Sequence, residues 1–363
     1  FTIDDVAYVG TGVDTAEQTL KDFWKYDAAL DSWSQVADLP ASQRRNAIAF
    51  SINGYGYVGT GMDSTNASAP MANTLNDFWQ YNPGTNTWLQ KANYPGGLGN
   101  GIYFATGFAI DSRGYVCCGK RGPNQYSSEM WEYKPTLDQW NQLANFPGGV
   151  RYQLSSFVIG FKAYVGLGTD QDMYRKDIWQ FDASTNQWTQ KSDLPSSERG
   201  SAMTFSIGQR GYVCMGTNGG ILDDLWEYNP FSDSWTSREN YGGSERKNAV
   251  AFTVNGKGYV GIGKGYSGKK ASFQEYYPPE IVGIEELVSD LFVYPNPTED
   301  VINISTSSLL IERYEVYSSY GNMVISSEST SLINVEHLSP GIYFLAGIDN
   351  SGQTIAKQKL FIR

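Results

Sequence analysis

The sequence predicts an all-β chain built from a repeated four-stranded unit, because two markers recur along it in phase. The ten tryptophans form five pairs whose members lie nine positions apart: Trp24/Trp33, Trp79/Trp88, Trp131/Trp140, Trp179/Trp188 and Trp226/Trp235. A Tyr-Val marker recurs at intervals of 47 to 58 residues, at Tyr8, Tyr57, Tyr115, Tyr164, Tyr212 and Tyr259. Self-similarity at such a period is typical of repeat architectures.

Each unit divides into four short strands. A Phe stands seven residues before each marker tyrosine, and Asn-Gly pairs such as Asn53-Gly54 lie between them, which predicts a tight hairpin. A variable loop follows, then a strand at the first tryptophan, a polar turn and a strand at the second tryptophan. Four antiparallel strands at this period are typical of propeller blades. The six markers therefore predict a six-bladed propeller over residues 1–279.

The repeat resembles the kelch-repeat family, as found in the central domain of galactose oxidase. The resemblance rests on the aromatic residue and glycines ending the second strand and on the Tyr-(Asp/Asn)-Pro…Trp element after the variable loop. The family's double glycine is Gly-x-Gly here, as at Gly59/Gly61 and Gly166/Gly168. Glycine at this place lets the backbones of neighbouring blades approach closely, and we expect the tryptophans to fill the wedges between blades.

The sixth unit departs from the pattern, because it reads KKASFQEYYPPE and contains no tryptophan. We therefore expect its outermost strand to be missing. Propellers of the kelch family close by letting one terminus complete the blade of the other. Residues upstream of Phe1 are expected to supply the strand, and the linker from Glu280 to Leu287 is the alternative.

After Pro278-Pro279 the composition changes to short alternating apolar runs without tryptophan. Residues 280–290 read as a linker and residues 291–363 as a small immunoglobulin-like β-sandwich. This segment contains, in order, the motifs Tyr294-Pro295-Asn296-Pro297, YEVYSSYGNMV, Gly341-Ile342-Tyr343 and the closing KQKLFIR. In this order they resemble the C-terminal sorting domain of the type IX secretion system of Bacteroidetes.

That resemblance implies export across the outer membrane and a secreted or cell-surface protein. The type IX secretion machinery is then a partner of the C-terminal domain. A plain immunoglobulin-like interaction module is the alternative, and a sandwich fold alone would not separate the two.

Composition excludes several classes of function. A net charge of −11 has the wrong sign for a fold that neutralises phosphates, so nucleic acid is not an expected partner. No apolar stretch approaches the roughly 20 residues that a membrane span needs. Cys117, Cys118 and Cys214 are expected to pack as small apolar residues within strands, without a disulfide framework.

The only histidine, His337, lies in the predicted sandwich, where a surface turn is the expected setting. A propeller without histidine cannot hold a His-based triad or the copper site of galactose oxidase. No metal and no cofactor are predicted.

A repeated arginine is the first candidate for ligand binding. Arg44, Arg151, Arg199 and Arg246 each stand six residues before the Phe marker, and Ile102 takes this place in the remaining unit. A ring of arginines near a channel mouth could hold a carboxylate or sulfate in bidentate fashion. Alternatively, each arginine pairs with an acidic loop residue and joins neighbouring blades.

Carboxylates and tyrosines complete the candidate set. Glu198 and Glu245 directly precede two of the arginines, and Tyr103, Tyr126, Tyr152, Tyr174 and Tyr266 lie in the loops. An acidic residue also stands two positions before each first tryptophan: Asp22, Asp77, Glu129, Asp177 and Asp224. We expect these five to accept backbone hydrogen bonds where the loop enters the strand.

Two hypotheses follow for the propeller. The first is a non-catalytic module that binds a glycan or a protein through the loops, using the four arginines, Glu198, Glu245, Tyr152 and Tyr174. The second is a sugar-modifying enzyme that resembles the kelch-type sialic-acid epimerase, with Glu198 or Glu245 as base. A carboxylate and an arginine in a deep pocket would favour the enzyme, and a shallow rim with exposed tyrosines would favour binding.

Overall fold

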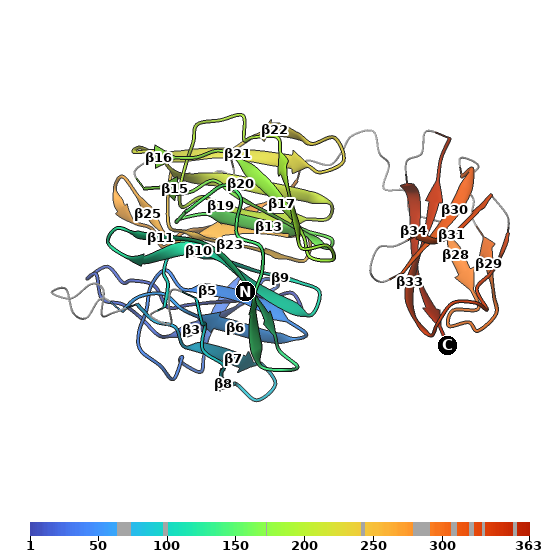
Figure 1. The fold of residues 1–363 in the computed structure, drawn as a ribbon, viewed down its shortest axis with the longest axis horizontal. Coiled ribbons are helices and arrows are strands. Elements are labelled where there is room, and N and C mark those ends of the chain that lie inside the picture. Colours follow the sequence, from blue (N-terminus) through green and yellow to red (C-terminus); the bar gives the residue numbers. More distant parts are fainter. Residues whose placement is uncertain are drawn as a thin grey trace. The chain divides into compact units, whose positions relative to one another are not determined.

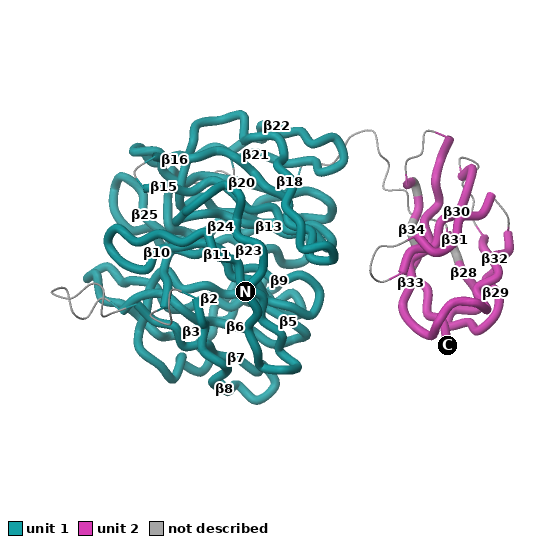
Figure 2. Tube along the Cα trace, viewed as in Figure 1, with its two compact units in different colours: residues 1–278 teal, residues 279–363 magenta. Residues whose placement is uncertain are grey.

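The structure, a computed structural model, describes residues 1–63, 74–96, 101–171, 173–240, 244–278, 291–305, 311–318, 323–328, 331–350 and 354–363. The described residues form strands, turns and loops, and none of them lies in a helix that could cross a membrane. The chain divides into two compact units, Phe1–Pro278 and Pro279–Arg363 (Figure 2). The all-β prediction is confirmed.

Among the described residues, unit 1 contains five four-stranded antiparallel sheets and one three-stranded sheet, which correspond to the six repeats. Sheet 1 contains β1 (Thr2–Ile3), β2 (Val6–Gly10), β3 (Phe23–Asp27) and β4 (Ser32–Val36). Sheet 2 contains β5 (Ile48–Ile52), β6 (Tyr55–Gly59), β7 (Phe78–Asn82) and β8 (Thr87–Lys91). Sheet 3 contains β9 (Thr106–Ile110), β10 (Arg113–Gly122), β11 (Gln125–Lys134) and β12 (Gln139–Gln142).

The second half of unit 1 repeats this order and adds two short hairpins. Sheet 4 contains β13 (Ser155–Ile159), β14 (Lys162–Gly166), β17 (Ile178–Asp182) and β18 (Gln187–Lys191). Sheet 5 contains β19 (Met203–Ile207), β20 (Arg210–Thr217), β21 (Ile221–Asn229) and β22 (Ser234–Arg238). Sheet 6 contains β23 (Val250–Val254), β24 (Lys257–Gly261) and β27 (Phe273–Tyr276). The hairpins are β15 (Thr169–Asp170) with β16 (Met173–Tyr174), and β25 (Lys264–Gly265) with β26 (Gly268–Lys269).

The sheets succeed one another in a closed ring. The first strands contact each other in the order β5, β9, β13, β19, β23, and β1 contacts both β23 and β5. Figure 1 shows the sheets of unit 1 stacked side by side, with β15, β16 and β25 at one end of the unit. This arrangement is that of a propeller, in which the first strand of each sheet is innermost.

The Phe and Tyr markers face each other across the two inner strands of every sheet. Phe50 is the direct partner of Tyr57 in the β5–β6 register, and their rings stack with centroids 5.9 Å apart. The same stacking joins Phe205 to Tyr212 at 5.0 Å. Stacked aromatic pairs stabilise a sheet beyond their buried area, by about 0.5–1.5 kcal/mol each. The regular spacing of these markers therefore reflects the packing of their side chains in the core of each sheet.

The tryptophans pack between sheets, as expected. Trp131 and Trp140 of sheet 3 contact the buried cluster of Phe50, Tyr57 and Phe78 in sheet 2. The indole Nε1 of Trp140 donates to the carbonyl of Ala92, 2.9 Å away, just after the outermost strand of sheet 2. Trp88, Trp188 and Trp235 donate in the same way to Ala37, Ala144 and Ser192. The second tryptophan of these pairs therefore joins the outer edges of neighbouring sheets.

Sheet 6 ends at β27 in the described residues, in line with the outermost strand that the sequence leaves unassigned. The linker proposed as an alternative source of that strand, residues 280–287, lies outside the described residues. Which residues supply the outermost strand of sheet 6 therefore stays a prediction.

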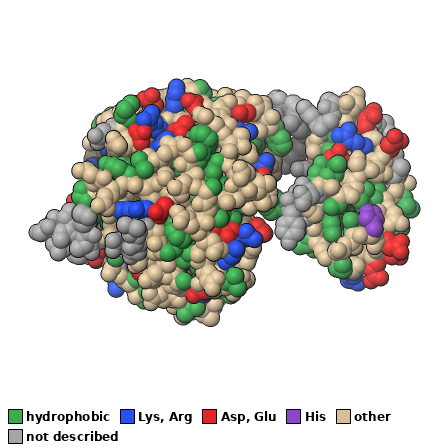
Figure 3. Space-filling view, viewed as in Figure 1, with side chains coloured by type: hydrophobic (Ala, Val, Ile, Leu, Met, Phe, Trp, Pro, Cys, Tyr) green, Lys and Arg blue, Asp and Glu red, His purple; other side chains and the backbone are tan. Residues whose placement is uncertain are grey.

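Unit 2 consists of two antiparallel sheets around one apolar core. One contains β28 (Phe292–Tyr294), β29 (Val301–Ser305) and β32 (Leu332–Asn334); the other contains β31 (Met323–Glu328), β30 (Arg313–Ser318), β33 (Gly341–Ile348) and β34 (Thr354–Ile362). Ile302, Val316, Leu345 and Leu360 are fully buried between them. His337 is exposed in a turn as predicted, and the only histidine is visible in purple in Figure 3.

Candidate functional site

The repeated arginine is a buried connector between successive sheets. The Arg199 amide donates to the carbonyl of Arg175 in sheet 4, and its carbonyl accepts from the amide of Gly168 in the same sheet. Its side chain points the other way, into sheet 5, where it reaches Asp224 and the carbonyl of Met215. One residue thus holds two sheets together. Arg44 and Arg151 do the same between sheets 1 and 2 and between sheets 3 and 4.

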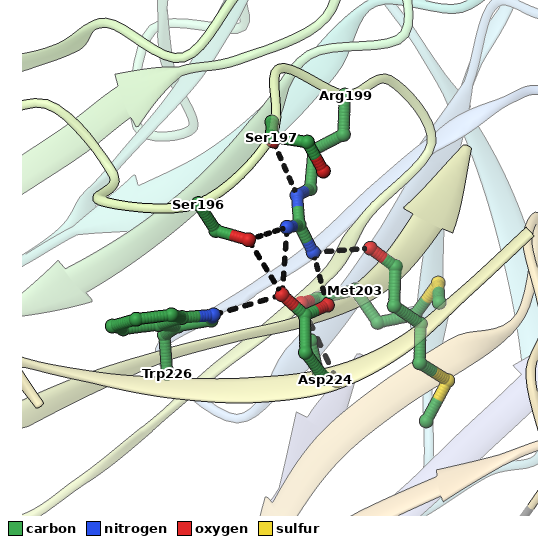
Figure 4. A network of polar contacts seen from close by, with 8 residues as sticks. Ser196, Ser197, Arg199, Met203, Asp224 and Trp226 are labelled. Atoms are coloured by element: carbon green, nitrogen blue, oxygen red, sulfur yellow. Dashed lines mark hydrogen bonds and ion pairs between the residues drawn. The ribbon is translucent and has the colours of Figure 1, made fainter. Parts of the chain in front are cut away.

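Three of the four guanidinium groups are bound in bidentate fashion by the aspartate two positions before the first tryptophan of the next sheet. Arg199 donates to the two carboxylate oxygens of Asp224 at 2.5 and 2.8 Å, and also to Ser196 and Ser197 (Figure 4). The pair Arg44–Asp77 has distances of 2.8 and 2.6 Å. Charge-assisted bidentate pairs are among the strongest polar contacts in proteins. These acids also accept from the indole of the following tryptophan, as Asp224 does from Trp226 at 2.8 Å.

The pKa of these carboxyl groups reflects the pairing. Burial raises the pKa of Asp224, but the hydrogen bonds and the charge of Arg199 lower it by more, so that its pKa lies below the ordinary value of 3.8. The pKa of Asp77 is lowered by Arg44 against the same effect of burial. Both carboxyl groups are therefore ionised at neutral pH, and their charge is balanced within the framework.

The structure therefore corrects the assignment of the arginines as ligand-binding residues. The exposed fractions of Arg44, Arg151, Arg199 and Arg246 are 0%, 2%, 0% and 0%. A buried guanidinium already shared between a carboxylate and a carbonyl is not available to an outside ligand. The alternative from the sequence, an ion pair that joins neighbouring sheets, describes the contacts of Arg44, Arg151 and Arg199. The acids, expected to accept from the backbone, have arginine and indole N–H donors as their main partners.

Sheets 3 and 6 show how the connector changes. Where Ile102 replaces the arginine, Glu129 replaces the aspartate and pairs with Arg121 of the neighbouring strand β10. In sheet 6, Ser272 stands in the acidic position, and Arg246 donates to its carbonyl and hydroxyl oxygens at 3.0 and 3.1 Å. Both positions change in sheet 3, whereas sheet 6 keeps the arginine and replaces the acid with serine.

The two predicted carboxylates, Glu198 and Glu245, lie apart from the arginine side chains that follow them. Glu198 is exposed, and Glu245, which is half-buried, accepts from the amide of Tyr266 at 3.1 Å. Neither forms an ion pair with the arginine that follows it among the described contacts, because those guanidinium groups point into the next sheet. The structure therefore does not bring Glu198 and Glu245 into one pocket with the arginines.

A feature that the sequence analysis missed lies on the loop face, which we define as the end of unit 1 where the loops after the second strands meet the connections between sheets. There, one residue of the connection pairs with a residue of the first loop strand, and that residue pairs in turn with one of the second loop strand. The three residues form a cross-strand row that we call a rung. The rungs are Arg45/Met62/Thr74, Tyr103/Lys120/Tyr126, Tyr152/Thr169/Tyr174, Gly200/Thr217/Ile221 and Lys247/Lys264/Lys269. Cross-strand partners share a sheet face, so each rung groups its side chains.

The tyrosine rungs of sheets 3 and 4 meet. The rings of Tyr126 and Tyr152 stack with centroids 5.3 Å apart at 22°, and Phe104 packs against Tyr152. The ammonium of Lys120 lies 5.3 Å from the Tyr126 centroid and 4.9 Å from that of Tyr152. Tyr126, Tyr152 and Tyr174 are half-buried, so part of each ring remains open to solvent. We call Tyr126, Tyr152 and Lys120 the tyrosine platform.

The motif residues of unit 2 lie beside the end of the chain. The amide of Phe361 donates to the side-chain oxygen of Asn296 at 2.8 Å, and Arg363 donates to the carbonyl of Thr298 at 2.8 Å. Tyr294, Pro295 and Pro297 are exposed, as is Gly341. Tyr343 donates through its hydroxyl to Ser339 at 2.9 Å. The motif near the start of unit 2 is therefore hydrogen-bonded to the last residues of the chain.

Comparison with known protein families identifies both parts of the chain. The family described as KLHDC2/KLHL20/DRC7 Kelch-repeats domain matches residues 103–263, and the Secretion system C-terminal sorting domain matches residues 292–363. The chain therefore carries a kelch-repeat propeller and a type IX sorting domain, and it is exported to the cell surface or the extracellular space.

Individual relatives match over short segments. An N-acetylneuraminate epimerase of Yersinia enterocolitica is 33% identical over 93 residues, which are 25% of this chain and 22% of that protein. The enzyme of that name from Pasteurella multocida is 31% identical over 88 residues, which are 24% of this chain and 22% of that protein. The matches span about a fifth of the relatives' length.

Among solved structures, the Structure of YjhT has a TM-score of 0.62 at 16% identity, covering 76% of this chain and 92% of that one. At this identity the likeness establishes the propeller fold alone.

Proposed function

We propose that unit 1 is a non-catalytic module that binds a carbohydrate at the tyrosine platform on the loop face. The observation that carries this proposal is the stack of Tyr126 on Tyr152 beneath the Lys120 ammonium. Half-open tyrosine rings offer flat apolar surface with a polar edge, which suits the apolar face and the hydroxyl rim of a sugar ring. Sheet 3 is also where the framework departs from the repeat, since Ile102 stands in place of the arginine.

The surroundings of the platform supply further contact groups. Met173, on the hairpin next to Tyr174, has an exposed fraction of 62%. Tyrosines contribute large contact areas at low cost in conformational entropy. Exposed side chains beside the tyrosine platform favour binding of a ligand over its chemical conversion.

A sugar-modifying enzyme is the second candidate, and the partial similarity to two N-acetylneuraminate epimerases is what favours it. A base and an arginine facing one substrate would be needed in a water-excluding pocket. Here, however, the four repeated arginines are buried, three of them in ion pairs with aspartate, and Glu198 is exposed. We therefore place binding first.

The proposal is tested on a glycan array with the full chain and two single variants, Tyr126→Ala and Tyr152→Ala. Tyr55→Ala serves as the matched control, because Tyr55 is also partly exposed but starts strand β6 at a hairpin turn. We expect binding of at least one glycan by the wild type and the control, and at least tenfold weaker binding by the platform variants.

Two results would refute the proposal. The first is an array on which the folded wild type retains no glycan. The second is unchanged affinity of both platform variants, with thermal unfolding curves showing that they are folded. Incubation of the retained glycan with the protein, followed by mass spectrometry and NMR of the sugar, separates binding from the enzymatic alternative.

A further inference from the structure

Sheet 6 carries a rung made entirely of lysines. Lys247 is paired with Lys264 across an isolated bridge, and Lys264 with Lys269 across the β25–β26 hairpin. The corresponding rung of sheet 5 is Gly200/Thr217/Ile221, and that of sheet 4 is Tyr152/Thr169/Tyr174. Three neighbouring cations are therefore not a requirement of the repeat.

Like charges directly opposite each other destabilise a sheet. The lysine rung is unusual for a second reason, because the chain as a whole has a net charge of −11. Lys264 is exposed, and Lys247 and Lys269 are half-buried. A concentration of positive charge that costs stability on an acidic protein indicates a surface that meets negative charge.

The neighbouring sheets show that a carboxylate fits beside these cations. Lys269 forms an ion pair of 3.0 Å with Glu17 of sheet 1, and the side chain of Glu17 is 67% exposed. The hydrogen bond and charge of Lys269 lower the pKa of Glu17, and the charges of Lys264 and Arg45 act in the same direction. Three cations from two segments, the β25–β26 hairpin and the connection between sheets 1 and 2, thus act on one exposed carboxylate at the loop face.

We propose that Lys247 and Lys264 form an anion subsite, and that the carbohydrate bound by unit 1 carries carboxylate or sulfate groups. This inference rests on the proposed function, and it names the class of sugar for the same loop face. Sheet 6 lies across the ring from sheet 3, so an anionic oligosaccharide would cross the channel mouth from the tyrosine platform to the lysine rung. A single sugar ring would engage one of the two.

The test measures the affinity of the full chain for three hexasaccharides by calorimetry: a neutral galactose hexamer, a galacturonic acid hexamer and a sulfated galactose hexamer. We expect at least one anionic hexamer to bind about tenfold or more tightly than the neutral one, the size of one charge-assisted hydrogen bond. The preference should fall as ionic strength rises from 0.05 to about 0.5 M. The two anionic arms separate carboxylate from sulfate recognition.

The double variant Lys247→Gln/Lys264→Gln should bring the anionic and neutral hexamers within about twofold of each other. Lys25→Gln/Lys162→Gln is the control, because it removes the same charge from exposed positions on β3 and β14. Lys269 is kept, so that its pair with Glu17 stays intact.

Equal affinity of the wild type for the three hexamers, with binding still lost in Tyr152→Ala, would overturn the anion subsite while leaving the proposed function in place. Equal loss of preference in the control variant would also overturn it. Absence of binding of all three hexamers to the folded wild type would also overturn the anion subsite, whereas the sugar ligand itself is tested by the glycan array.

Discussion

Sheets 2 and 3 differ in the arginine that pairs with the acidic residue before their first tryptophan. In sheet 2 a fully buried arginine, Arg44, reaches from the connection to Asp77 and to the carbonyl of Thr60. In sheet 3 the connection supplies Ile102, and the acid, now Glu129, takes its arginine from strand β10. The connector in sheet 2 joins two sheets, whereas Arg121 and Glu129 belong to one hairpin.

The difference indicates which parts of the repeat are fixed. The acid–indole contact is kept in both sheets, at Asp77–Trp79 and Glu129–Trp131. The arginine from the connection is replaced in sheet 3. There, strands β10 and β11 extend to Gly122 and Gln125 and carry Lys120 and Tyr126. Sheet 3, which lacks the buried arginine of the repeat, is therefore also the sheet that carries Lys120 and Tyr126 of the tyrosine platform.

The largest expected effect comes from removing a buried connector. Arg199→Ala leaves the carboxylate of Asp224 and the carbonyl of Met215 without this donor in the interior. Breaking a buried ion pair costs about 3–5 kcal/mol. Urea unfolding followed by tryptophan fluorescence measures it, because the ten tryptophans lie between residues 24 and 235 and so report on unit 1 alone.

The matched control is Arg175→Ala, whose pair with Asp170 lies on the loop face with side chains 40% and 27% exposed. Its loss should cost less than about 1 kcal/mol, as for exposed ion pairs in general. Equal destabilisation by the two variants would contradict the assignment of Arg199 as a connector.

The pair of sheet 3 should give an intermediate value. Arg121→Ala removes the partner of Glu129, but Arg121 is 19% exposed and its contacts stay within one hairpin. We expect a loss of about 1–3 kcal/mol, the cost of leaving a partly buried charged group unsatisfied. A loss as large as that of Arg199→Ala, in the same urea assay, would show that joining two sheets adds nothing.

The pH dependence of the unfolding free energy gives a further test of the pair between Arg199 and Asp224. The pKa of Asp77 and Asp224 is lowered in the folded protein, so these groups contribute stability that is present above their ordinary pKa of 3.8 and is lost as pH falls through the lower folded value. In Arg199→Ala that contribution of Asp224 is gone. The gap in unfolding free energy between wild type and variant should therefore narrow as pH falls below about 4. A gap that stays constant or widens would contradict the pairing.

Much of the fold follows from the sequence, and the reason is periodicity. The Phe and Tyr markers, the tryptophan pairs and the glycines recur because each unit repeats one packing problem, so their spacing alone locates the strands. The partners of Arg44, Arg151 and Arg199 were also within reach, since Asp stands before the first tryptophan of the unit that each of them enters and Glu where Ile102 replaces the arginine. Covariation between repeats is the signal that was left unused.

The rungs, in contrast, could not be derived from the sequence. They depend on the register of loop strands, and that register is set by bulges such as the one between Cys117 and Gly119. The variable loops have no common period, so nothing in the spacing of Tyr103, Lys120 and Tyr126 places them in one row. Only the pairing of strands brings them together.

The central claim is that stability resides in the connectors and binding in the loop face. Measuring unfolding free energy and affinity for an array-selected glycan on Arg199→Ala and Tyr152→Ala tests it most directly, with binding assayed at a temperature where both variants are folded. We predict that Arg199→Ala loses about 3–5 kcal/mol of stability and keeps its affinity within about twofold, whereas Tyr152→Ala loses at least tenfold in affinity and less than about 1 kcal/mol. A folded Arg199→Ala that no longer binds, beside a Tyr152→Ala that binds normally, would contradict the account.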